Sequence, residues 1–329
     1  MHLPGGASVS IATARPVTEG WSNAIAVNPR VLRCTADDGR TVVVKMRRPP
    51  GDPRQRDGFH RELSALLLLA ELGCDAGPRL LATDDSAGLL VLEDLGDGPA
   101  LEDLLVGSDP GAATVGFVAM AEAVGRMHAA TLGQAEALGA PWFWDQIDGP
   151  IKEILSSGPM VLSNGDLAPQ NCRITGGRAR LLDFEDAACQ HPLLDVAHFR
   201  LPFYGGPCWA RVPAFVTERV ESAYRRSAGR TADRSWAEGL AAAVGAWTLI
   251  RLVRVPKLLI EDAPHPMGFS RRGQLLDTLR VGVEATDGVL PHLAAHFAAT
   301  ERDLRERWPG LPGAQAVYPA YASAGDHPE

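Results

Sequence analysis

Three side chains that could bind a divalent cation lie around one short hairpin. The glycine pair at 176–177 is a two-residue turn of the kind that joins antiparallel strands. Its register places Asn171 beside Asp183, because cross-strand neighbours lie roughly 5 Å apart, and Asp166 stands just before the first strand at the same end. The sequence therefore predicts that Asp166, Asn171 and Asp183 converge on one point.

The chemistry that these residues suit is the binding of magnesium beside phosphate. A few hard oxygen donors, partly anionic, hold an ion that keeps water and takes its other ligands from phosphates. The alternative is a set of ordinary turns, since Asp and Asn side chains bond readily to nearby backbone. The joint spacing of Asp166, Asn171 and Asp183 favours the metal site.

The segment 164–185 resembles the catalytic loop and the metal loop of kinases. It reads N-x-D-x-x-x-x-N followed by D-F-E, where kinases have H-x-D-x-x-x-x-N followed by D-F-G. The pattern is most similar to the aminoglycoside phosphotransferase and choline kinase family, in which the loop reads HGDLxxxN and other residues replace the last glycine. This resemblance implies a kinase-type site.

The resemblance also implies a role for each residue of the two loops. Asp166 would be the catalytic aspartate, and Asn171 and Asp183 would bind magnesium. Asp195, in the next helix, would brace the catalytic loop. Asn164 stands where the family usually has histidine; that residue supports the loop by hydrogen bonding and does not transfer the proton, and an Asn amide can donate similarly.

The N-terminal part of the chain contains the candidate contacts to the nucleotide phosphates. A β-branched run at 41–46 leads to Lys45, and a lysine at the end of a buried strand is usually an edge residue. By the resemblance, Lys45 contacts the α- and β-phosphates. Gly20, Ser22 and Asn23 resemble the glycine-containing turn over the phosphates, although a plain hairpin turn would have the same sequence.

An amphipathic helix is predicted at about 57–72. Its apolar stripe consists of Phe59, Leu63, Leu66, Leu67 and Ala70. Glu62 and Glu71 lie on opposite flanks of this stripe, so the periodicity does not decide which of them pairs with Lys45. The resemblance favours Glu62, and the alternative for either is a solvated carboxylate at the helix edge.

Two short strands at 78–83 and 88–93 precede a change to polar residues and glycine, which we take as the lobe boundary. The resemblance implies a hinge at about 93–98 whose backbone binds adenine, with Glu93 and Leu95 as candidates. The expected organisation has three parts. They are an N-terminal nucleotide-binding lobe at 1–93, a C-terminal catalytic and substrate-binding lobe at 94–308, and a Pro/Ala/Gly-rich tail at 309–329.

The C-terminal lobe is predicted to be mainly helical. The expected helices lie at 101–106, 115–131, 208–227, 232–254, 269–283 and 289–307. We interpret His128 as a packed or capping histidine. The aromatic cluster at 142–144 is interpreted as core or as a patch that packs the lobes, with substrate stacking as the alternative. Arg251, Arg254 and Lys257 are expected on a solvated face. The fold class that follows is α+β, a two-lobed protein-kinase-like fold with a small β-sheet lobe containing one main helix and a larger α-helical lobe.

Composition excludes several classes of partner. The chain has 329 residues and a formal net charge of −8, which argues against nucleic acid or an anionic membrane as a partner. Five cysteines without a C-x-x-C pair are typical of a reduced, cytoplasmic protein. The first residues lack the apolar segment of a secretory signal.

The expected function is phosphorylation of a hydroxyl group on a small molecule, with ATP as donor, GTP as the alternative donor, and Mg²⁺ as cofactor. An aminoglycoside, another antibiotic, a sugar or an amino alcohol would be the acceptor, and Glu185, Asp186, Glu261 and Asp262 could meet a cationic one. The alternatives are a non-catalytic nucleotide-binding scaffold and a protein kinase. The short interval from Asp183 to Asp195 argues against the latter, because it leaves no room for an activation loop.

Overall fold

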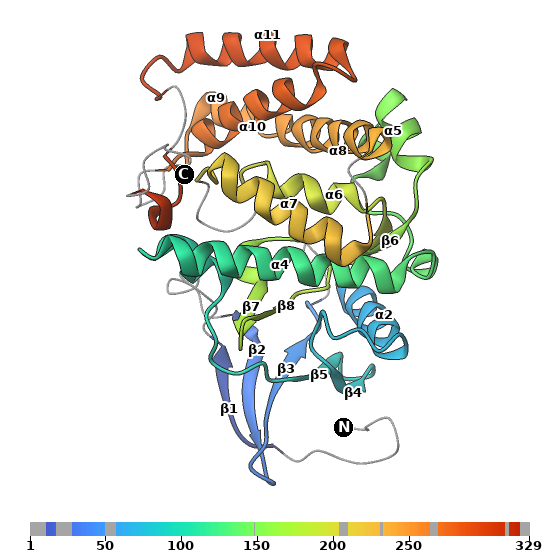
Figure 1. Ribbon diagram of the computed structural model, residues 1–329. Helices are drawn as coiled ribbons and strands as arrows, with labels where there is room; N and C mark the ends of the chain where they lie inside the picture. Colours follow the sequence, from blue (N-terminus) through green and yellow to red (C-terminus); the bar gives the residue numbers. More distant parts are fainter. Residues whose placement is uncertain are drawn as a thin grey trace.

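The chain folds into two lobes, a small one built on a β-sheet and a larger one built of helices (Figure 1). The computed structural model describes residues 11–17, 28–49, 57–147, 149–203, 210–230, 233–263, 269–312 and 316–322. Gly20, Ser22 and Asn23 lie outside the described residues. The predicted two-lobed α+β architecture is confirmed.

The small lobe contains a five-stranded antiparallel sheet in the order β1-β2-β3-β5-β4. Its strands are β1 (Ile11–Val17), β2 (Asn28–Ala36), β3 (Thr41–Met46), β4 (Leu80–Asp84) and β5 (Leu89–Glu93). The predicted β-branched run forms the central strand β3, in which Lys45 lies opposite Val31 on β2 and Leu90 on β5. Because side chains alternate along a strand, Val44 packs on one face while Lys45 projects from the other.

One helix, α2 (Gly58–Glu71), packs against this sheet. Its buried residues are Phe59, Glu62, Ala65, Leu66 and Leu69. The predicted apolar stripe is therefore partly wrong, because Leu67 is 49% exposed and Ala70 is exposed as well. The helix is rotated so that Glu62 faces inward, where it pairs with Lys45. An interaction with the sheet, rather than apolar periodicity alone, determines which face is buried.

The large lobe is built around the long helix α4, which packs against α7 (Figure 1). Its helices are α3 (Leu101–Val106), α4 (Pro110–Thr131), α5 (Gly149–Ser156), α6 (Leu193–Val196), α7 (Ala214–Ala228), α8 (Arg234–Leu252), α9 (Val255–Ile260), α10 (Arg271–Thr286) and α11 (Pro291–Arg307). Two short antiparallel pairs complete it. They are β6 (Val161–Ser163) with β9 (Ala188–Gln190), and β7 (Cys172–Thr175) with β8 (Arg178–Leu181).

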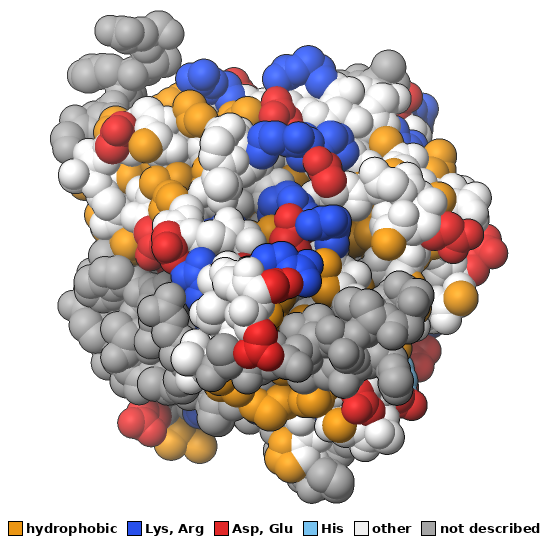
Figure 2. Space-filling view, turned by 90° about the horizontal axis from the view of Figure 1, so that it is seen from below, with side chains coloured by type: hydrophobic (Ala, Val, Ile, Leu, Met, Phe, Trp, Pro, Cys, Tyr) orange, Lys and Arg blue, Asp and Glu red, His pale blue; other side chains and the backbone are white. Residues whose placement is uncertain are grey.

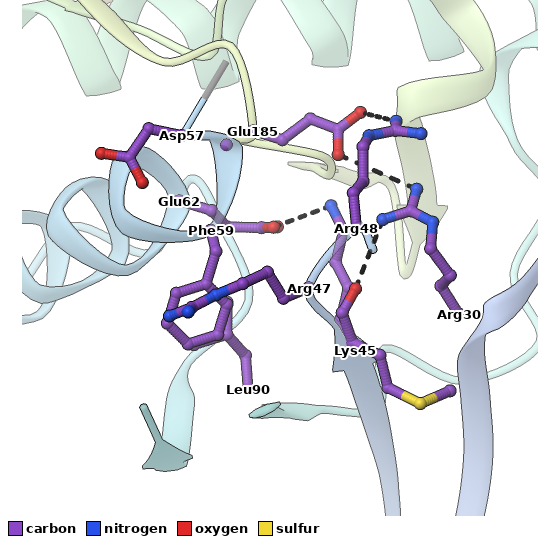
Figure 3. A pocket seen from close by; sticks show the side chains of 11 residues that line it. Arg30, Lys45, Arg47, Arg48, Asp57, Phe59, Glu62, Leu90 and Glu185 are labelled. Atoms are coloured by element: carbon purple, nitrogen blue, oxygen red, sulfur yellow. Dashed lines mark hydrogen bonds and ion pairs between the residues drawn. The ribbon is translucent and has the colours of Figure 1, made fainter. Parts of the chain in front are cut away.

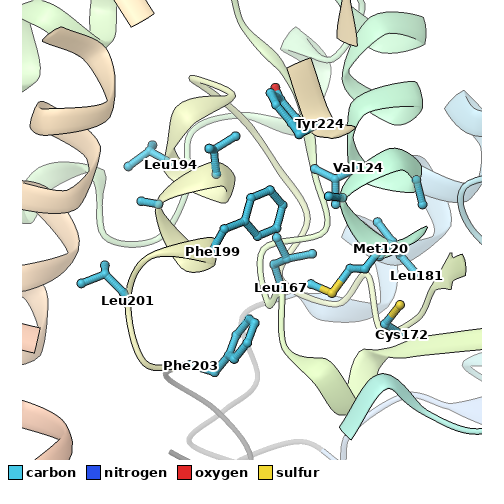
Figure 4. Close-up of a cluster of buried hydrophobic side chains, with 14 of the residues drawn as sticks. Met120, Val124, Leu167, Cys172, Leu181, Leu194, Phe199, Leu201, Phe203 and Tyr224 are labelled. Atoms are coloured by element: carbon cyan, nitrogen blue, oxygen red, sulfur yellow. The ribbon is translucent and has the colours of Figure 1, made fainter. Parts of the chain in front are cut away.

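The hydrophobic core of the large lobe holds the predicted catalytic loop. Figure 4 shows Leu167, which directly follows Asp166, among Met120 and Val124 of α4 and Phe199. All four side chains are buried. Fully burying a side chain such as leucine contributes roughly 1.5–3 kcal/mol, so Leu167 anchors the loop to α4.

The predicted solvated face of the long C-terminal helix is wrong for one arginine. Arg251 is only 2% exposed, and its Nη1 donates to Thr278 Oγ1 at 3.1 Å. Arg254 is half-buried and donates to Gln274, whereas Lys257 is exposed as expected. The reason is that α8 packs against α5, α6 and α10 together, so that most of its circumference is covered.

Two other predictions concern packing in this lobe. His128 is buried, as expected of a packed histidine. The aromatic cluster is packed as well, because Phe143 is buried and its ring centroid lies 4.6 Å from that of Trp247. Part of the expected C-terminal tail is packed too: Tyr318 and Tyr321 are buried. None of the described helices is long and apolar enough to cross a membrane.

Candidate active site

The predicted register of the β7–β8 hairpin is confirmed. Thr175 pairs with Arg178 across the glycine turn, and the amide of Leu182 donates to the carbonyl of Asn171 at 2.7 Å. Asn171 is the last residue of a short 3-10 helix (Pro169–Asn171) that leads into β7. The turn therefore places Asn171 beside the start of the metal loop at Asp183.

Asn171 also contacts the predicted catalytic aspartate. Its Nδ2 donates to Asp166 Oδ2 at 3.0 Å and to the Asp166 carbonyl at 3.1 Å. Burial, together with the negative charges of Asp183 and Asp186, raises the pKa of Asp166 to about 7. The amide of Asn171 therefore holds in position a carboxyl group on which these negative charges act.

The metal loop has an unusual backbone at its first residue. Asp183 has φ of 59°, in the left-handed region that residues other than glycine rarely adopt. Such strain persists only where the surrounding structure imposes it, and it is common at functional sites. Here the Asp183 carboxyl group binds Lys45 Nζ. The conformation therefore points the carboxyl group toward the small lobe.

Lys45 links the two lobes through a pair of carboxylates. Its Nζ lies 2.7 Å from Glu62 Oε2 and also donates to Asp183 Oδ1, and Figure 3 shows the contact with Glu62. Burial alone would lower the pKa of Lys45, but the charges of Asp183 and Glu62 outweigh it and raise the pKa. Glu62 Oε1 in turn accepts a hydrogen bond from the Phe184 amide at 3.4 Å. Of the two glutamates on α2, Glu62 is the partner, and Glu71 is exposed.

The catalytic and metal loops touch at a glycine. Gly165 has φ of 78°, and a Cβ built there would lie 1.9 Å from the carbonyl oxygen of Asp186. A larger residue would force the loops apart, so glycine is required between Asn164 and Asp166. Asn164 joins the same loops, because its Nδ2 lies 3.4 Å from the Asp166 carbonyl and 3.3 Å from the Leu182 carbonyl. Its amide thus donates to the loop, as expected of a substitute for histidine.

Asp195 contacts the catalytic loop through residues that sequence reasoning missed. Its Oδ1 accepts hydrogen bonds from Ser163 Oγ and Gln190 Nε2, both at 2.8 Å, and its Oδ2 lies 3.1 Å from His128 Nε2. Ser163 Oγ accepts a bond from the Gly165 amide at 3.0 Å. A serine before a turn gives no distinctive signal, so the connection is visible only in three dimensions.

Two further arginines line the pocket beside Lys45. Arg48 Nη2 binds Glu185 Oε1, and Arg30 Nη2 lies 3.9 Å from Glu185 Oε2 (Figure 3). Both positive charges help to lower the pKa of Asp183, which shows that they stand near the metal loop. Sequence reasoning did not select Arg30 or Arg48; the only signal was the basic run that follows Lys45.

The two hinge candidates differ in their backbone amides. The Glu93 amide donates to the Arg79 carbonyl at 2.9 Å, so it is not available to a nucleotide. The Leu95 amide has no hydrogen-bond partner within the part of the chain that the structure describes, while the Leu95 carbonyl accepts from Thr175 Oγ1 at 3.4 Å. Of the two candidates, Leu95 is therefore the one whose backbone amide could donate to a nucleotide base.

The donor set around Asp183 fits magnesium. Asn171 uses its Nδ2 on Asp166, which leaves its Oδ1 as an acceptor for a cation. No group of three or more His, Cys, Asp or Glu side chains able to hold a metal occurs among the described residues. Asp183 and Asn171 together suit an ion that takes few protein ligands and completes its shell with water and phosphate, as Mg²⁺ does.

Comparison with known proteins supports the architecture. No family model matches the chain, and no curated protein matches it in sequence. Solved structures match it in fold. A choline/ethanolamine kinase family protein from Mesorhizobium loti is 15% identical, with 90% of this chain and 93% of that chain covered and a TM-score of 0.51. A proposed aminoglycoside phosphotransferase from Ralstonia eutropha JMP134 is 16% identical, with 92% and 95% covered and a TM-score of 0.51. At these identities the likeness establishes the fold.

Proposed function

We propose that this protein is a small-molecule kinase of the aminoglycoside phosphotransferase and choline kinase family, which uses ATP and Mg²⁺ to phosphorylate a hydroxyl group. One observation carries the proposal: a kinase-like fold brings Lys45, Asp166, Asn171 and Asp183 together where its two lobes meet. Each of these residue types matches what phosphoryl transfer needs there.

Asp166 is the proton acceptor in this proposal. A general base works best when its pKa lies near the operating pH, and the pKa of Asp166 is raised to about 7. The Asn171 amide fixes the orientation of its carboxyl group. Asp166 would orient the acceptor hydroxyl and take its proton late, because the transition state of phosphoryl transfer is loose.

Lys45, Glu62 and Asp183 bind the donor side. Lys45 would steady the α- and β-phosphates while Glu62 holds its ammonium group in place. Asp183 and the Asn171 oxygen would hold Mg²⁺, which when bound neutralises charge on the phosphate oxygens. Lys45 also binds Asp183 directly, so binding of the nucleotide would exchange this contact for contacts with metal and phosphate.

The structure favours a small acceptor over a protein. Between Asp183 and Asp195 the chain forms only a turn, the short strand β9 and the start of α6, so there is no activation segment to hold a peptide. The negative charges of Asp186 and Glu185 help to raise the pKa of Asp166, and the Asp186 carbonyl packs against Gly165, the residue before Asp166. An acceptor with a positive charge close to its hydroxyl group would be attracted to this site.

A coupled ADP-release screen tests the proposal. It uses Mg²⁺, ATP and a panel of aminoglycosides, amino alcohols and sugars. The Asp166→Asn variant should lose about 10²–10⁴-fold in turnover and retain ATP binding. The matched control is Asp145→Asn, which removes a fully exposed carboxylate of the large lobe and should leave turnover unchanged. Unchanged turnover in Asp166→Asn would refute its assigned role, and ATP binding without turnover on any acceptor would favour a non-catalytic scaffold.

A further inference from the structure

A second hollow lies in the large lobe, away from the site already described. It encloses about 450 Å³ between α5, the end of α7, the start of α8 and the junction of β9 with α6. Figure 1 shows α5 and α8 on the opposite side of α4 from the β-sheet. The residues that matter here are Gly158, His191, Tyr224, Arg230, Trp236 and Gly239. This volume is in the range of small-molecule sites.

His191 presents a hydrogen-bond donor to this hollow. Its side chain is only 7% exposed, and its Nδ1 accepts a bond from the Leu193 amide at 3.3 Å, so the proton of the neutral ring is on Nε2. Burial and the charge of Arg230 lower the pKa of His191 to about 4, which keeps the ring neutral near pH 7. Nε2 has no hydrogen-bond partner among the residues that the structure describes.

Glycines make room for this ring. A Cβ on Gly158 would lie 2.3 Å from His191 Nε2, and one on Gly239 would lie 3.4 Å from His191 Cε1. Both glycines line the hollow. The absence of side chains at these positions therefore lets the ring pack against both glycine backbones at the wall of the hollow.

Arg230 adds a positive charge to the lining of the hollow. Its guanidinium group has no ion pair in the described part of the chain. The two acidic residues that line the hollow are engaged elsewhere. Asp233 Oδ1 caps α8 by accepting from the Trp236 amide at 3.0 Å, and Glu238 Oε1 accepts from Arg234 Nε at 2.7 Å. The hollow thus offers a guanidinium group and a neutral N–H donor that lack acceptors of their own.

We propose that this hollow is a second ligand site that binds a small organic anion between Arg230 and His191. A guanidinium group and an N–H donor together suit the oxygens of a carboxylate or a phosphate ester. The site uses no residue of the candidate active site, so the inference holds whether or not the protein is a kinase.

The same hollow is connected to the catalytic loop by buried hydrogen bonds. Tyr224, which lines it, has its hydroxyl group 2.8 Å from His128 Nδ1. His128 Nε2 contacts Asp195, and Asp195 accepts from Ser163. Ser163 in turn accepts the amide of Gly165. An occupant that restricts Tyr224 should therefore also restrict the loop that carries Asp166.

Binding of fluorinated probes, observed by ¹⁹F NMR, tests the site. The probes are 4-fluorobenzoate, 4-fluorophenyl phosphate and, as the neutral control, 4-fluorobenzamide. The wild-type protein should bind at least one anion and not the amide. Arg230→Gln should weaken binding by about tenfold, the value of one charge-assisted hydrogen bond. The matched control is Arg226→Gln, an exposed arginine in the last turn of α7, four residues before Arg230, whose Nη1 bonds to Ser222, and it should bind like the wild type.

Each result of this experiment has one meaning. Loss in Arg230→Gln alone supports the site, and whichever anion shows that loss identifies the carboxylate or the phosphate as the ligand group. Absence of anion binding, equal binding of the amide, or equal affinity of the Arg230→Gln and Arg226→Gln variants would overturn it.

Hydrogen exchange tests the connection separately. Saturation with the anion should slow exchange of the Gly165 amide by about fivefold in the wild type, a modest coupling between two sites. Tyr224→Phe removes the hydroxyl contact to His128, so it should abolish this protection while it retains binding of the anion. Equal protection in Tyr224→Phe, or none in the wild type, would rule out coupling along this path.

Discussion

The carboxyl groups at the hinge and Asp166 at the catalytic end of the lobe junction have pKa values shifted in opposite directions. At the hinge, Asp94 accepts a bond from Arg33 Nε at 2.5 Å and Glu93 accepts one from Arg180 Nη2 at 3.0 Å. Burial would raise the pKa of both carboxyl groups. The Arg33 side chain holds the pKa of Asp94 below its ordinary value, and the Arg79 amide together with Arg180 does the same for Glu93. At the catalytic end, burial and neighbouring carboxylates raise the pKa of Asp166 to about 7.

This difference indicates which end is built to receive a cation. Seen from the side of the sheet, Lys and Arg side chains lie among Asp and Glu near the centre of the face (Figure 2). At the hinge, Arg33 and Arg180 supply the counter-charges of Asp94 and Glu93. Asp183 and Glu185 are likewise paired, with Lys45 and Arg48, but in the described part of the chain the Asp166 carboxyl group has only the neutral amide of Asn171 as a partner, and the nearby negative charges raise its pKa. An added divalent cation would relieve this excess, in agreement with the proposed Mg²⁺ site.

The largest effect on stability is expected for Lys45→Met. The variant leaves the buried Glu62 and the partly exposed Asp183 without their shared counter-ion, and removal of one partner of a buried ion pair typically costs 3–5 kcal/mol. The free energy of unfolding, measured in urea, should fall by about that amount. Lys45→Met combined with Glu62→Leu should recover part of the loss. A single variant as stable as the wild type would contradict the buried pairing.

The next effect is a pH dependence of stability that comes from Asp166. Its folded pKa is about 7, above the unfolded value of about 3.9, so the folded state binds the extra proton. Stability should therefore fall as pH rises from about 4 to 7 and remain low above pH 7. Asp166→Asn should be more stable than the wild type at pH 8, by a difference on the order of 4 kcal/mol, and equal to it near pH 4.

Urea unfolding in the presence of a chelator, at intervals between pH 4 and 8, measures this difference. The matched control is Asp97→Asn, which removes a carboxylate from the exposed part of the hinge, and it should show no such trend. If the stability gained from Asp166→Asn were the same at every pH, this would contradict a raised pKa of Asp166.

A smaller effect of opposite sign is expected at the hinge. Arg33→Gln removes the partner of Asp94, which is nearly buried, and should cost about 1–2 kcal/mol at pH 7. Because the folded pKa of Asp94 is lowered, its contribution is present above the unfolded value and is lost as pH falls through the folded pKa. The difference between Arg33→Gln and wild type should therefore shrink below about pH 4. Unfolding curves that stay equally far apart in acid would contradict this.

The smallest effect is expected for Arg178→Gln. Arg178 binds Asp75 at 2.6 Å, but both side chains are largely exposed, and such surface pairs contribute about 0.5 kcal/mol or less. The midpoint of thermal unfolding should remain within experimental error. If Arg178→Gln lowered stability as much as Arg33→Gln, the exposure of an ion pair would not determine how much that pair contributes to stability.

The parts of the site that the sequence predicted correctly depend on local rules. The glycine pair at 176–177 defines a two-residue turn, and the turn alone fixes which residues of β7 and β8 face each other. The β-branched run before Lys45 likewise defines β3. Both features follow from the conformations that a few neighbouring residues can adopt, so no knowledge of distant elements was needed.

The features that the sequence did not predict depend on packing between distant elements. The buried face of α2 includes Glu62 and excludes Leu67 because Lys45 attracts a carboxylate. Arg251 is buried because α8 has neighbours on several sides. The contacts of Ser163 with Asp195, and of Arg48 with Glu185, join residues that are far apart in sequence. Periodicity along one helix contains no information about such partners.

The central claim is that Asp183 and Asn171 hold a divalent cation that binds together with ATP. The most direct test is calorimetric titration of ATP into the Asp166→Asn variant, which prevents turnover, with and without Mg²⁺. We predict that ATP binding requires Mg²⁺ and becomes at least about tenfold weaker when Asp183→Asn is added, since a charged ligand contact is worth about 1.5–3 kcal/mol. Equal ATP affinity without Mg²⁺ and in the Asp183→Asn variant would contradict the claim.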